Sequence, residues 1–327
     1  RLTGDPYPIA EDVGYTGNEF ATFSVSRGGL LVYQTGSQSG AVSRFEIVDM
    51  NGKPLGEPSS ADFHRELSLS HDGKRVAYRS ADNITLWIRD LERDTTSRFT
   101  FDDGDHFSPV WSADDKWIIY VSDRDGPFRA YRKLSSGAGT EEVILESKEP
   151  LIAWDWSLDG KQIAFEIRQP ETDQDIAIYS FDEDRLEVLI QSPLSDFEPR
   201  FSPDGKWLAY SSTESGGFQV YLVSLDGTGG KFQISTENGL HPEWAPTGDR
   251  LYYFSPNAEV MAVDLQFGDT VEIGLPKKLF PIRYPVNTEY PFRIRPDGES
   301  FVINQIGEAI SSDHMVLVQN WPTLLDP

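Results

Sequence analysis

The sequence predicts an all-β fold made of repeated four-stranded antiparallel sheets, and three observations support that prediction. A turn motif, clearest as Phe-Ser-Pro-Asp-Gly-Lys within residues 199–212, recurs seven times along the 327 residues. The fourth residues of these motifs lie 44, 42, 45, 45, 43 and 50 positions apart. Each turn is followed by an apolar run that ends in aromatic residues, and aromatic residues make up 12% of the chain. A period near 45 residues with several strands per repeat is typical of a β-propeller.

The turn motif itself has a structural explanation. Pro can occupy the first central position of a turn, Asp can bond to nearby backbone amides, and Gly accepts a positive φ. The flanking strands are apolar on both faces, as expected for sheets that pack against a neighbour on each side. The Asp residues of the turns are therefore interpreted as structural rather than as a metal or acid–base array. The motifs occupy residues 26–29, 70–73, 112–115, 157–160, 202–205, 245–248 and 295–298.

Seven repeats can close into one ring, so residues 1–327 are predicted to form a single seven-bladed domain. Residues 6–13 read as a strand without a nearby partner, and the seventh repeat lacks a fourth strand. We therefore expect residues 6–13 to close the last blade, because this leaves no unpaired edge inside the ring. A six-bladed ring is the less favoured alternative. The predicted blades span residues 19–58, 62–102, 106–147, 151–193, 197–238, 240–282 and 288–321.

Composition excludes several classes of function. The absence of cysteine removes disulfides, thiol catalysis and cysteine-ligated metals. A formal charge of −24 disfavours nucleic-acid binding and is compatible with a cationic protein or peptide partner. No apolar run approaches the length of a membrane span, so no direct membrane insertion is expected. The chain begins at Arg1 without a signal segment, which suggests a processed form or an excised domain.

The pattern Phe-Ser-Pro-Asp-Gly-Lys-x-x-Ala-Tyr resembles the repeats of TolB-like propellers, a WD-like class, over nearly the whole chain. Residues 21–36, 231–236 and 315–321 resemble the C-terminal propeller of certain bacterial serine/threonine protein kinases and of free-standing relatives. The resemblance implies a binding role and an extracytoplasmic location, either periplasmic or in the cell envelope. The chain has no glycine-rich ATP loop, His-Arg-Asp loop or Asp-Phe-Gly segment, so it is not itself a kinase.

The loops that precede the inner strands are the candidate binding site. If each inner strand runs towards its Pro-Asp-Gly turn, these loops gather at the opposite end of the central channel and form a polar funnel. Loops on a rigid scaffold often carry binding groups. The turns would then point away from the binding face. The predicted ligand-binding residues are His64, Asp105, His106, Asp196, Glu198, His241 and Glu289.

The leading hypothesis is a non-enzymatic propeller that binds a protein or ligand through this funnel, with no catalytic residue, metal or cofactor assigned. One alternative is a metal-dependent oligosaccharide lyase, in which His64, His106 and His241 would converge on a divalent metal. Another is a structural subunit of a larger envelope assembly. A serine hydrolase is not supported, because the chain lacks a Gly-x-Ser-x-Gly elbow and a second domain to hold one.

Overall fold

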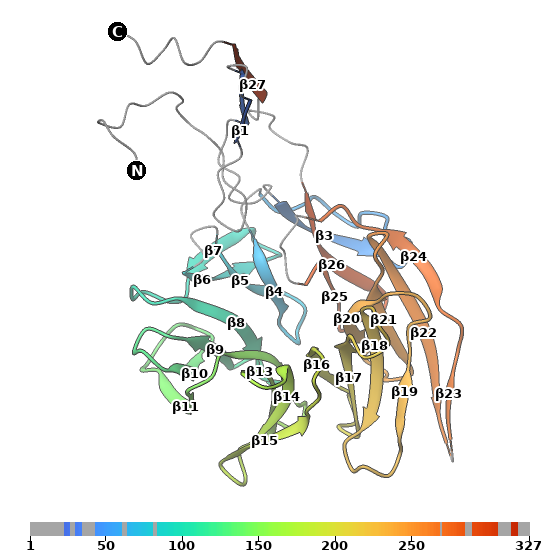
Figure 1. The fold of residues 1–327 in the computed structure, drawn as a ribbon. Coiled ribbons are helices and arrows are strands. Elements are labelled where there is room, and N and C mark those ends of the chain that lie inside the picture. Colours follow the sequence, from blue (N-terminus) through green and yellow to red (C-terminus); the bar gives the residue numbers. More distant parts are fainter. Residues whose placement is uncertain are drawn as a thin grey trace.

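The computed structural model confirms an all-β chain whose strands pair antiparallel (Figure 1). Within the part of the chain that it describes, every regular element is a strand, and no helix is long and apolar enough to cross a membrane. The described residues are 23–26, 30–34, 43–60, 64–80, 84–268, 270–284, 290–306 and 315–319.

Five sheets follow the predicted plan of strands that are consecutive in the chain. The first contains β4 (Arg65–Leu69), β5 (Arg75–Arg79), β6 (Leu86–Asp90) and β7 (Thr95–Arg98). The second contains β8 (His106–Trp111), β9 (Trp117–Ser122), β10 (Phe128–Leu134) and β11 (Glu142–Ser147). The third contains β12 (Leu151–Trp156), β13 (Gln162–Gln169), β14 (Asp173–Ser180) and β15 (Arg185–Ile190).

The fourth and fifth sheets continue this order. The fourth contains β16 (Asp196–Phe201), β17 (Trp207–Ser212), β18 (Gln219–Ser224) and β19 (Lys231–Gln233). The fifth contains β20 (Leu240–Trp244), β21 (Arg250–Phe254), β22 (Glu259–Phe267), β23 (Val271–Ile273) and β24 (Lys277–Pro281), with both of the last two strands paired to β22.

The sixth sheet joins distant parts of the chain. It contains β25 (Phe292–Ile294), β26 (Ser300–Ile306) and β3 (Ser43–Asp49), with Val302 opposite Ile47. On the outer side of β3, the amide of Leu55 donates to the carbonyl of Ile47 at 2.8 Å. An N-terminal segment therefore does complete the last sheet, but it is the segment predicted to belong to the first blade. The predicted closing strand at residues 6–13 lies outside the described residues.

A separate three-stranded sheet contains β1 (Phe23–Val25), β2 (Leu30–Gln34) and β27 (Met315–Gln319). Figure 1 shows β1 and β27 apart from the other sheets. The strands predicted for the blades at 19–58 and 288–321 are therefore divided between two sheets in a different way: β1 and β2 pair with β27, and β3 pairs with β26. A hairpin motif defines two strands but not the sheet that they join.

The inner strands of the six sheets form a ring in the described part of the chain. In order, β4, β8, β12, β16, β20 and β25 each contact the next, and β25 contacts β4. A seventh blade in this ring is not seen among the described residues. These six inner strands surround the axis of the ring. The ends that lead into the turn motifs therefore lie near one another.

Packing between sheets explains the continuous apolar runs. In β9, Ile118, Ile119, Tyr120 and Val121 are all fully buried. Ile118 and Tyr120 pack with residues of the first sheet, whereas Ile119 and Val121 pack with residues of the third. Alternate side chains of one strand therefore serve two interfaces. Burial of each such side chain contributes roughly 1.5–3 kcal/mol.

The turns have the predicted structural chemistry. In the fourth sheet, the hydroxyl of Ser202 donates to Asp204 at 2.6 Å, and Asp204 accepts from the amide of Lys206 at 3.1 Å. Gly205 has a φ of 69°, a conformation that favours glycine. The same serine–aspartate bond recurs in the turns of the first three sheets.

Candidate functional site

One register position of the inner strands contributes a lining residue to a shared pocket in each of the six sheets. It stands two positions before the first residue of the turn motif, so the same register position recurs in all six sheets. These residues differ in chemistry from one sheet to the next, although the strands that carry them are alike. They are Ser68, Val110, Asp155, Arg200, Glu243 and Arg293.

β-Bulges direct this register position towards the channel. The pairing register of β4, β8, β12, β16 and β20 shifts immediately before the pocket residue, as between Phe197 and Arg200 in β16. A bulge bends the strand and changes the direction of the next side chain. Without it, a charged residue in these apolar strands would face a neighbouring sheet.

The pocket lies at the turn end of the inner strands and has a volume of about 220 Å³. Trp111, Trp156 and Trp244 form part of its wall. Residues from the turns complete its lining, among them His71, Leu158, Pro203, Pro246 and Pro296. Leu158 is 48% exposed, so the pocket can be altered from the surface.

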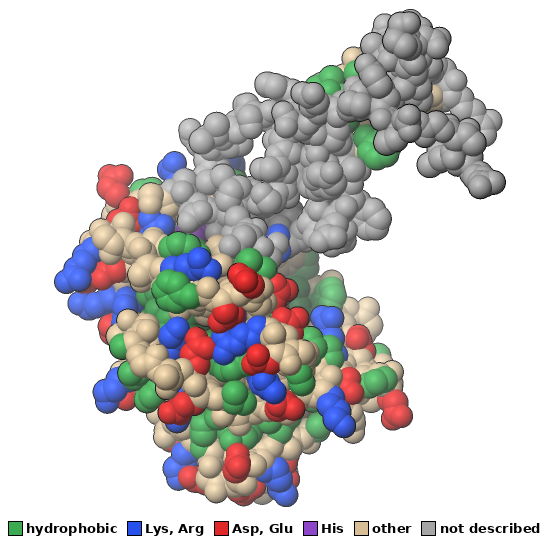
Figure 2. Space-filling view, turned by 90° about the vertical axis from the view of Figure 1, so that its left-hand side faces the viewer, with side chains coloured by type: hydrophobic (Ala, Val, Ile, Leu, Met, Phe, Trp, Pro, Cys, Tyr) green, Lys and Arg blue, Asp and Glu red, His purple; other side chains and the backbone are tan. Residues whose placement is uncertain are grey.

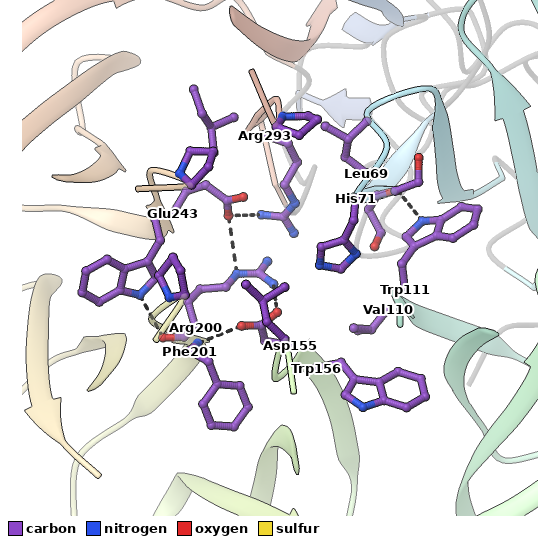
Figure 3. A pocket seen from close by; sticks show the side chains of 18 of the residues that line it. Leu69, His71, Val110, Trp111, Asp155, Trp156, Arg200, Phe201, Glu243 and Arg293 are labelled. Carbon is purple, nitrogen blue, oxygen red and sulfur yellow. Dashed lines mark hydrogen bonds and ion pairs between the residues drawn. The ribbon is translucent and has the colours of Figure 1, made fainter. Parts of the chain in front are cut away.

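Four charged residues lie close together in this pocket (Figure 3). One carboxylate oxygen of Glu243, Oε2, lies 2.9 Å from Nη1 of Arg293 and 3.6 Å from Nε of Arg200. On the other side of Arg200, Nη1 lies 3.8 Å from Oδ1 of Asp155. Oδ2 of Asp155 accepts from the amide of Phe201 at 2.7 Å. The two guanidinium groups therefore share Glu243.

Burial shifts the pKa values in this group. Burial raises the pKa of Asp155, although nearby Arg200 opposes the shift. Burial and the positive charge of Arg200 lower the pKa of Arg293. Burial is the largest single effect on Arg200 and disfavours its charge, but Glu243, Tyr290 and Asp155 together outweigh burial and raise the pKa of Arg200. The two arginines share Glu243, and Asp155 faces Arg200 from the other side, so the site contains two positive and two negative groups.

His71 lies at the turn side of the pocket. Its Nδ1 lies 3.5 Å from Oδ1 of Asp115, and its amide donates to the same carboxylate at 2.7 Å. Burial disfavours protonation of the ring, but Asp115 outweighs burial and raises the pKa of His71. A further positive charge can therefore form near the pocket at mildly acidic pH.

The sequence-predicted residues lie at the other end of the inner strands, the start end, and several are buried. His64 is 2% exposed, contacts the hydroxyl of Ser43 at 3.2 Å and packs against the rings of Phe45 and Tyr78. Burial, followed by the charge of Arg89, lowers the pKa of His64 to about 3. This histidine is a neutral packing residue.

His106 is fully buried and contacts Oδ1 of Asp102 at 2.7 Å. Burial lowers its pKa, against the opposing effect of Asp102. Asp105 has a half-exposed side chain and lies 3.8 Å from Arg79. Asp196 is buried and accepts from the hydroxyl of Ser192 at 2.7 Å.

Glu198 and His241 are the predicted residues that the structure brings into contact. Oε1 of Glu198 lies 2.7 Å from Nδ1 of His241, and Oε2 accepts from the amide of His241 at 2.7 Å and from the hydroxyl of Ser211 at 2.6 Å. Burial alone would raise the pKa of Glu198, but His241 and Ser211 lower it. Glu289 lies outside the described residues.

Hydrogen bonds between neighbouring inner strands explain this burial. The amide of Ser108 donates to Glu66 at 2.5 Å, and the amide of Ala153 donates to the hydroxyl of Ser108 at 3.0 Å. The bond from the His241 amide to Glu198 is of the same type. Side chains at the start end therefore tie one strand to the next.

The three histidines of the lyase alternative do not share a site. His64 contacts Phe45 and Tyr78, His106 contacts Tyr120, and His241 contacts Phe254. Among the described residues, no group of three or more His, Asp or Glu side chains is arranged to hold a metal ion.

The turn-end residues were not predicted from the sequence, because they lie within strands and not in the loops that usually carry binding groups. Their signal is visible in aligned repeats: charged residues recur two positions before the turn within otherwise apolar strands. Asp155, Arg200, Glu243 and Arg293 all follow this rule. A charged residue in a strand that is buried on both faces needs an oppositely charged partner or a polar cavity. A charge at this position therefore indicates a site inside the ring.

Comparison with known proteins agrees with the repeat pattern. The family model described as "TolB beta propeller domain" matches residues 137–273. The Tol-Pal system protein TolB of Francisella tularensis is 28% identical over 71% of this chain and 55% of its own length. The chain thus spans about half the length of this curated relative.

Solved structures show the same fold. The putative TolB from Agrobacterium tumefaciens has a TM-score of 0.64 and 20% identity, over 82% of this chain and 99% of that one. An oligogalacturonate lyase in complex with manganese has a TM-score of 0.52 and 16% identity, over 92% of this chain and 82% of that one. At such identity the likeness concerns fold alone. In its repeat sequence and in its fold, the chain is similar to TolB-like β-propellers.

Proposed function

We propose that this chain is a non-enzymatic binding propeller that holds a small ligand or a segment of a protein partner in the turn-end pocket. One observation carries the proposal: six inner strands present the same register position to one cavity, and four of these residues are charged. Side chains held on paired strands form a rigid, preformed site.

The comparisons support a protein partner. The Francisella relative is named as a component of the Tol-Pal system, and a system component works with other proteins. By resemblance to TolB-like propellers, we propose an extracytoplasmic location, periplasmic or at the cell envelope. The relation to sensor propellers of bacterial kinases stays a prediction.

The charge of the partner does not follow from the net charge of the chain. Acidic and basic side chains are interspersed on the side of the molecule that Figure 2 shows. A cationic partner would be favoured by a continuous acidic face, and that view offers none. The chemistry of the pocket is therefore the better guide to the ligand.

The predicted funnel at the start end is kept as a second location for binding, with the half-exposed Asp105 as its accessible residue. A subunit role in an envelope assembly is compatible with either location. A lyase activity has no support from the histidines, since their rings contact different residues.

A pair of matched leucine substitutions tests the proposal. Leu158→Trp places a bulky group at the pocket, whereas Leu275→Trp makes the same change at a leucine that is 81% exposed in the connection between β23 and β24. The purified variants are used to retain partners from an envelope extract of the source organism. We expect Leu158→Trp to abolish retention of a partner that the unmodified chain and Leu275→Trp both retain.

The charge-reversing variant Asp105→Lys distinguishes the two ends. If it abolishes retention while Leu158→Trp has no effect, the partner binds at the start end. Equal retention by all the variants would place the contact elsewhere and refute both locations. Each retained protein is then purified, and its affinity for the purified chain is measured by calorimetry. A protein that was retained only through a third protein would show no direct binding.

A further inference from the structure

Arg200 carries a hydrogen-bond donor that has no partner among the described residues. Its Nε faces Glu243, and its Nη1 donates to the carbonyl of Trp154 and faces Asp155. Its Nη2 is buried and has no hydrogen-bond partner within the described part of the chain. The residue is only 8% exposed. A buried donor without a partner is unfavourable, and more so when it is charged.

The nearby carboxylates are already engaged. Oε2 of Glu243 lies between Arg293 and Arg200, and Oδ2 of Asp155 accepts from the amide of Phe201. Both guanidinium groups also lie over the ring of Tyr290, at 4.1 Å for Arg293 and 5.1 Å for Arg200. The arginines are thus held side by side while sharing one acceptor.

The tryptophan walls provide apolar surface. The indole N–H of Trp111 donates to the carbonyl of Ser68 at 3.0 Å, and that of Trp244 to the carbonyl of Arg200 at 3.2 Å. The indole N–H of Trp156 donates to the carbonyl of Gly160 at 3.1 Å. Each indole N–H, the only donor of the side chain, is bonded to a backbone carbonyl, so the remaining surface of the ring is apolar.

We propose that the turn-end pocket binds a carboxylate attached to an apolar group, with the carboxylate accepting from Arg200 Nη2 and the apolar group against the tryptophans. The inference rests on the proposed function, because it names the ligand class of the same pocket. A guanidinium presents its donors in a planar fork that matches a carboxylate.

A cationic ligand fits the pocket less well. It would have to compete with Arg200 and Arg293 for Glu243, and it would leave Arg200 Nη2 unpaired. An uncharged apolar ligand would bury that donor further without supplying an acceptor. The carboxylate is the group that satisfies the pocket.

Two sources share this chemistry: the C-terminus of a peptide and a free organic acid. The probes are therefore two matched pairs, hexanoate with hexanamide and N-acetyl-dileucine with its C-terminal amide. Binding is measured by NMR titration of the purified chain. We expect each acid that binds to do so at least tenfold more tightly than its amide, and the better acid identifies the source.

Variants locate the effect in the pocket. Arg200→Gln should weaken acid binding at least tenfold, whereas Arg132→Gln, which removes an arginine paired with Glu142 outside the pocket, should leave it unchanged. Because Arg200 is buried, its loss could disturb folding. Leu158→Glu and Leu158→Lys avoid this difficulty, since Leu158 is half-exposed, and they should respectively weaken and strengthen binding two- to threefold by charge alone.

Three results would overturn the carboxylate inference: acids and amides binding equally, hexylamine binding more tightly than hexanoate, or no binding of any acid. Should acids and amides bind equally and both be blocked by Leu158→Trp, the inference fails while the proposed binding function stands. If partner retention depends on Leu158 but no acid binds, the same conclusion holds.

Discussion

The two ends of the inner strands differ in what surrounds their buried polar side chains. At the start end, Glu198 has its acceptors occupied by His241 and Ser211, and His64 is packed between aromatic rings. At the turn end, Arg200 keeps an unpaired donor beside a cavity. The start end also contains buried polar atoms without a hydrogen-bond partner among the described residues, such as His64 Nε2 and Asp196 Oδ1. An unpaired polar atom therefore indicates a binding site only where a cavity lies beside it.

The largest expected effect comes from removing Glu243. The Glu243→Ala variant would leave two buried guanidinium groups without their shared carboxylate, and we expect the free energy of unfolding to fall by about 3–5 kcal/mol. Urea denaturation measures the change. Glu142→Ala, at a half-exposed pair with Arg132, is the control and should change stability by less than about 1 kcal/mol. Equal losses in the two variants would mean that the turn-end charges are not held by Glu243.

The next effect is a pH dependence at the start end. Because the pKa of His64 is lowered from 6.5 to about 3, the unfolded chain binds the proton before the folded chain does. Stability from neutral His64 is therefore present above pH 6.5 and lost as the pH falls towards 3. Between pH 7 and pH 4, we expect the unmodified chain to lose about 3 kcal/mol more than His64→Phe. Parallel stability profiles of the two proteins would show that His64 is not held neutral.

A smaller loss is expected from Glu198→Ala. The substitution leaves the hydroxyl of Ser211 and the amide and ring of His241 without their acceptor, which should reduce stability by about 2 kcal/mol. Carboxylate binding at the turn end should stay within twofold of that of the unmodified chain. Thermal unfolding and the hexanoate titration measure the two quantities. A loss of hexanoate binding with little loss of stability would reverse the roles given to the two ends.

The smallest effect concerns His71, whose pKa is raised rather than lowered. Its pairing with Asp115 stabilises the fold below the pKa of the unfolded chain and is lost as the pH rises through the folded-state value. Since the ring is 36% exposed, the contribution should be below about 1 kcal/mol. His71→Gln should flatten stability between pH 6 and pH 8. Its profile should thus change in the opposite direction to that of His64→Phe.

Local features were predictable from the sequence, whereas long-range ones were not. The turn at residues 202–205 and the strand that follows it depend on neighbouring residues, and both were predicted. Pairing of β3 with β26 depends on contacts across most of the chain, so the sequence pattern assigned β3 to the wrong sheet. The bulge before Arg200 breaks strand alternation, so the direction of that side chain could not be read from periodicity.

The histidines show why accessible binding residues could not be predicted from the sequence. A histidine near a strand end in the sequence suggests a ligand, yet His64 and His106 are fully or almost fully buried. Burial depends on what packs above the residue, and for His64 this includes Asn304, whose side chain donates to the His64 carbonyl at 3.1 Å. No local pattern contains that information.

The sixth sheet determines the order in which this chain can fold. In this sheet Ile47 of β3 lies opposite Val302 of β26, so β3 emerges during synthesis long before β26 exists to pair with it. Until then β3 presents an open edge that can pair with another chain. Ring closure is consequently a late and slow event, and a chaperone that shields β3 until synthesis of β26 is complete should raise the yield of folded protein.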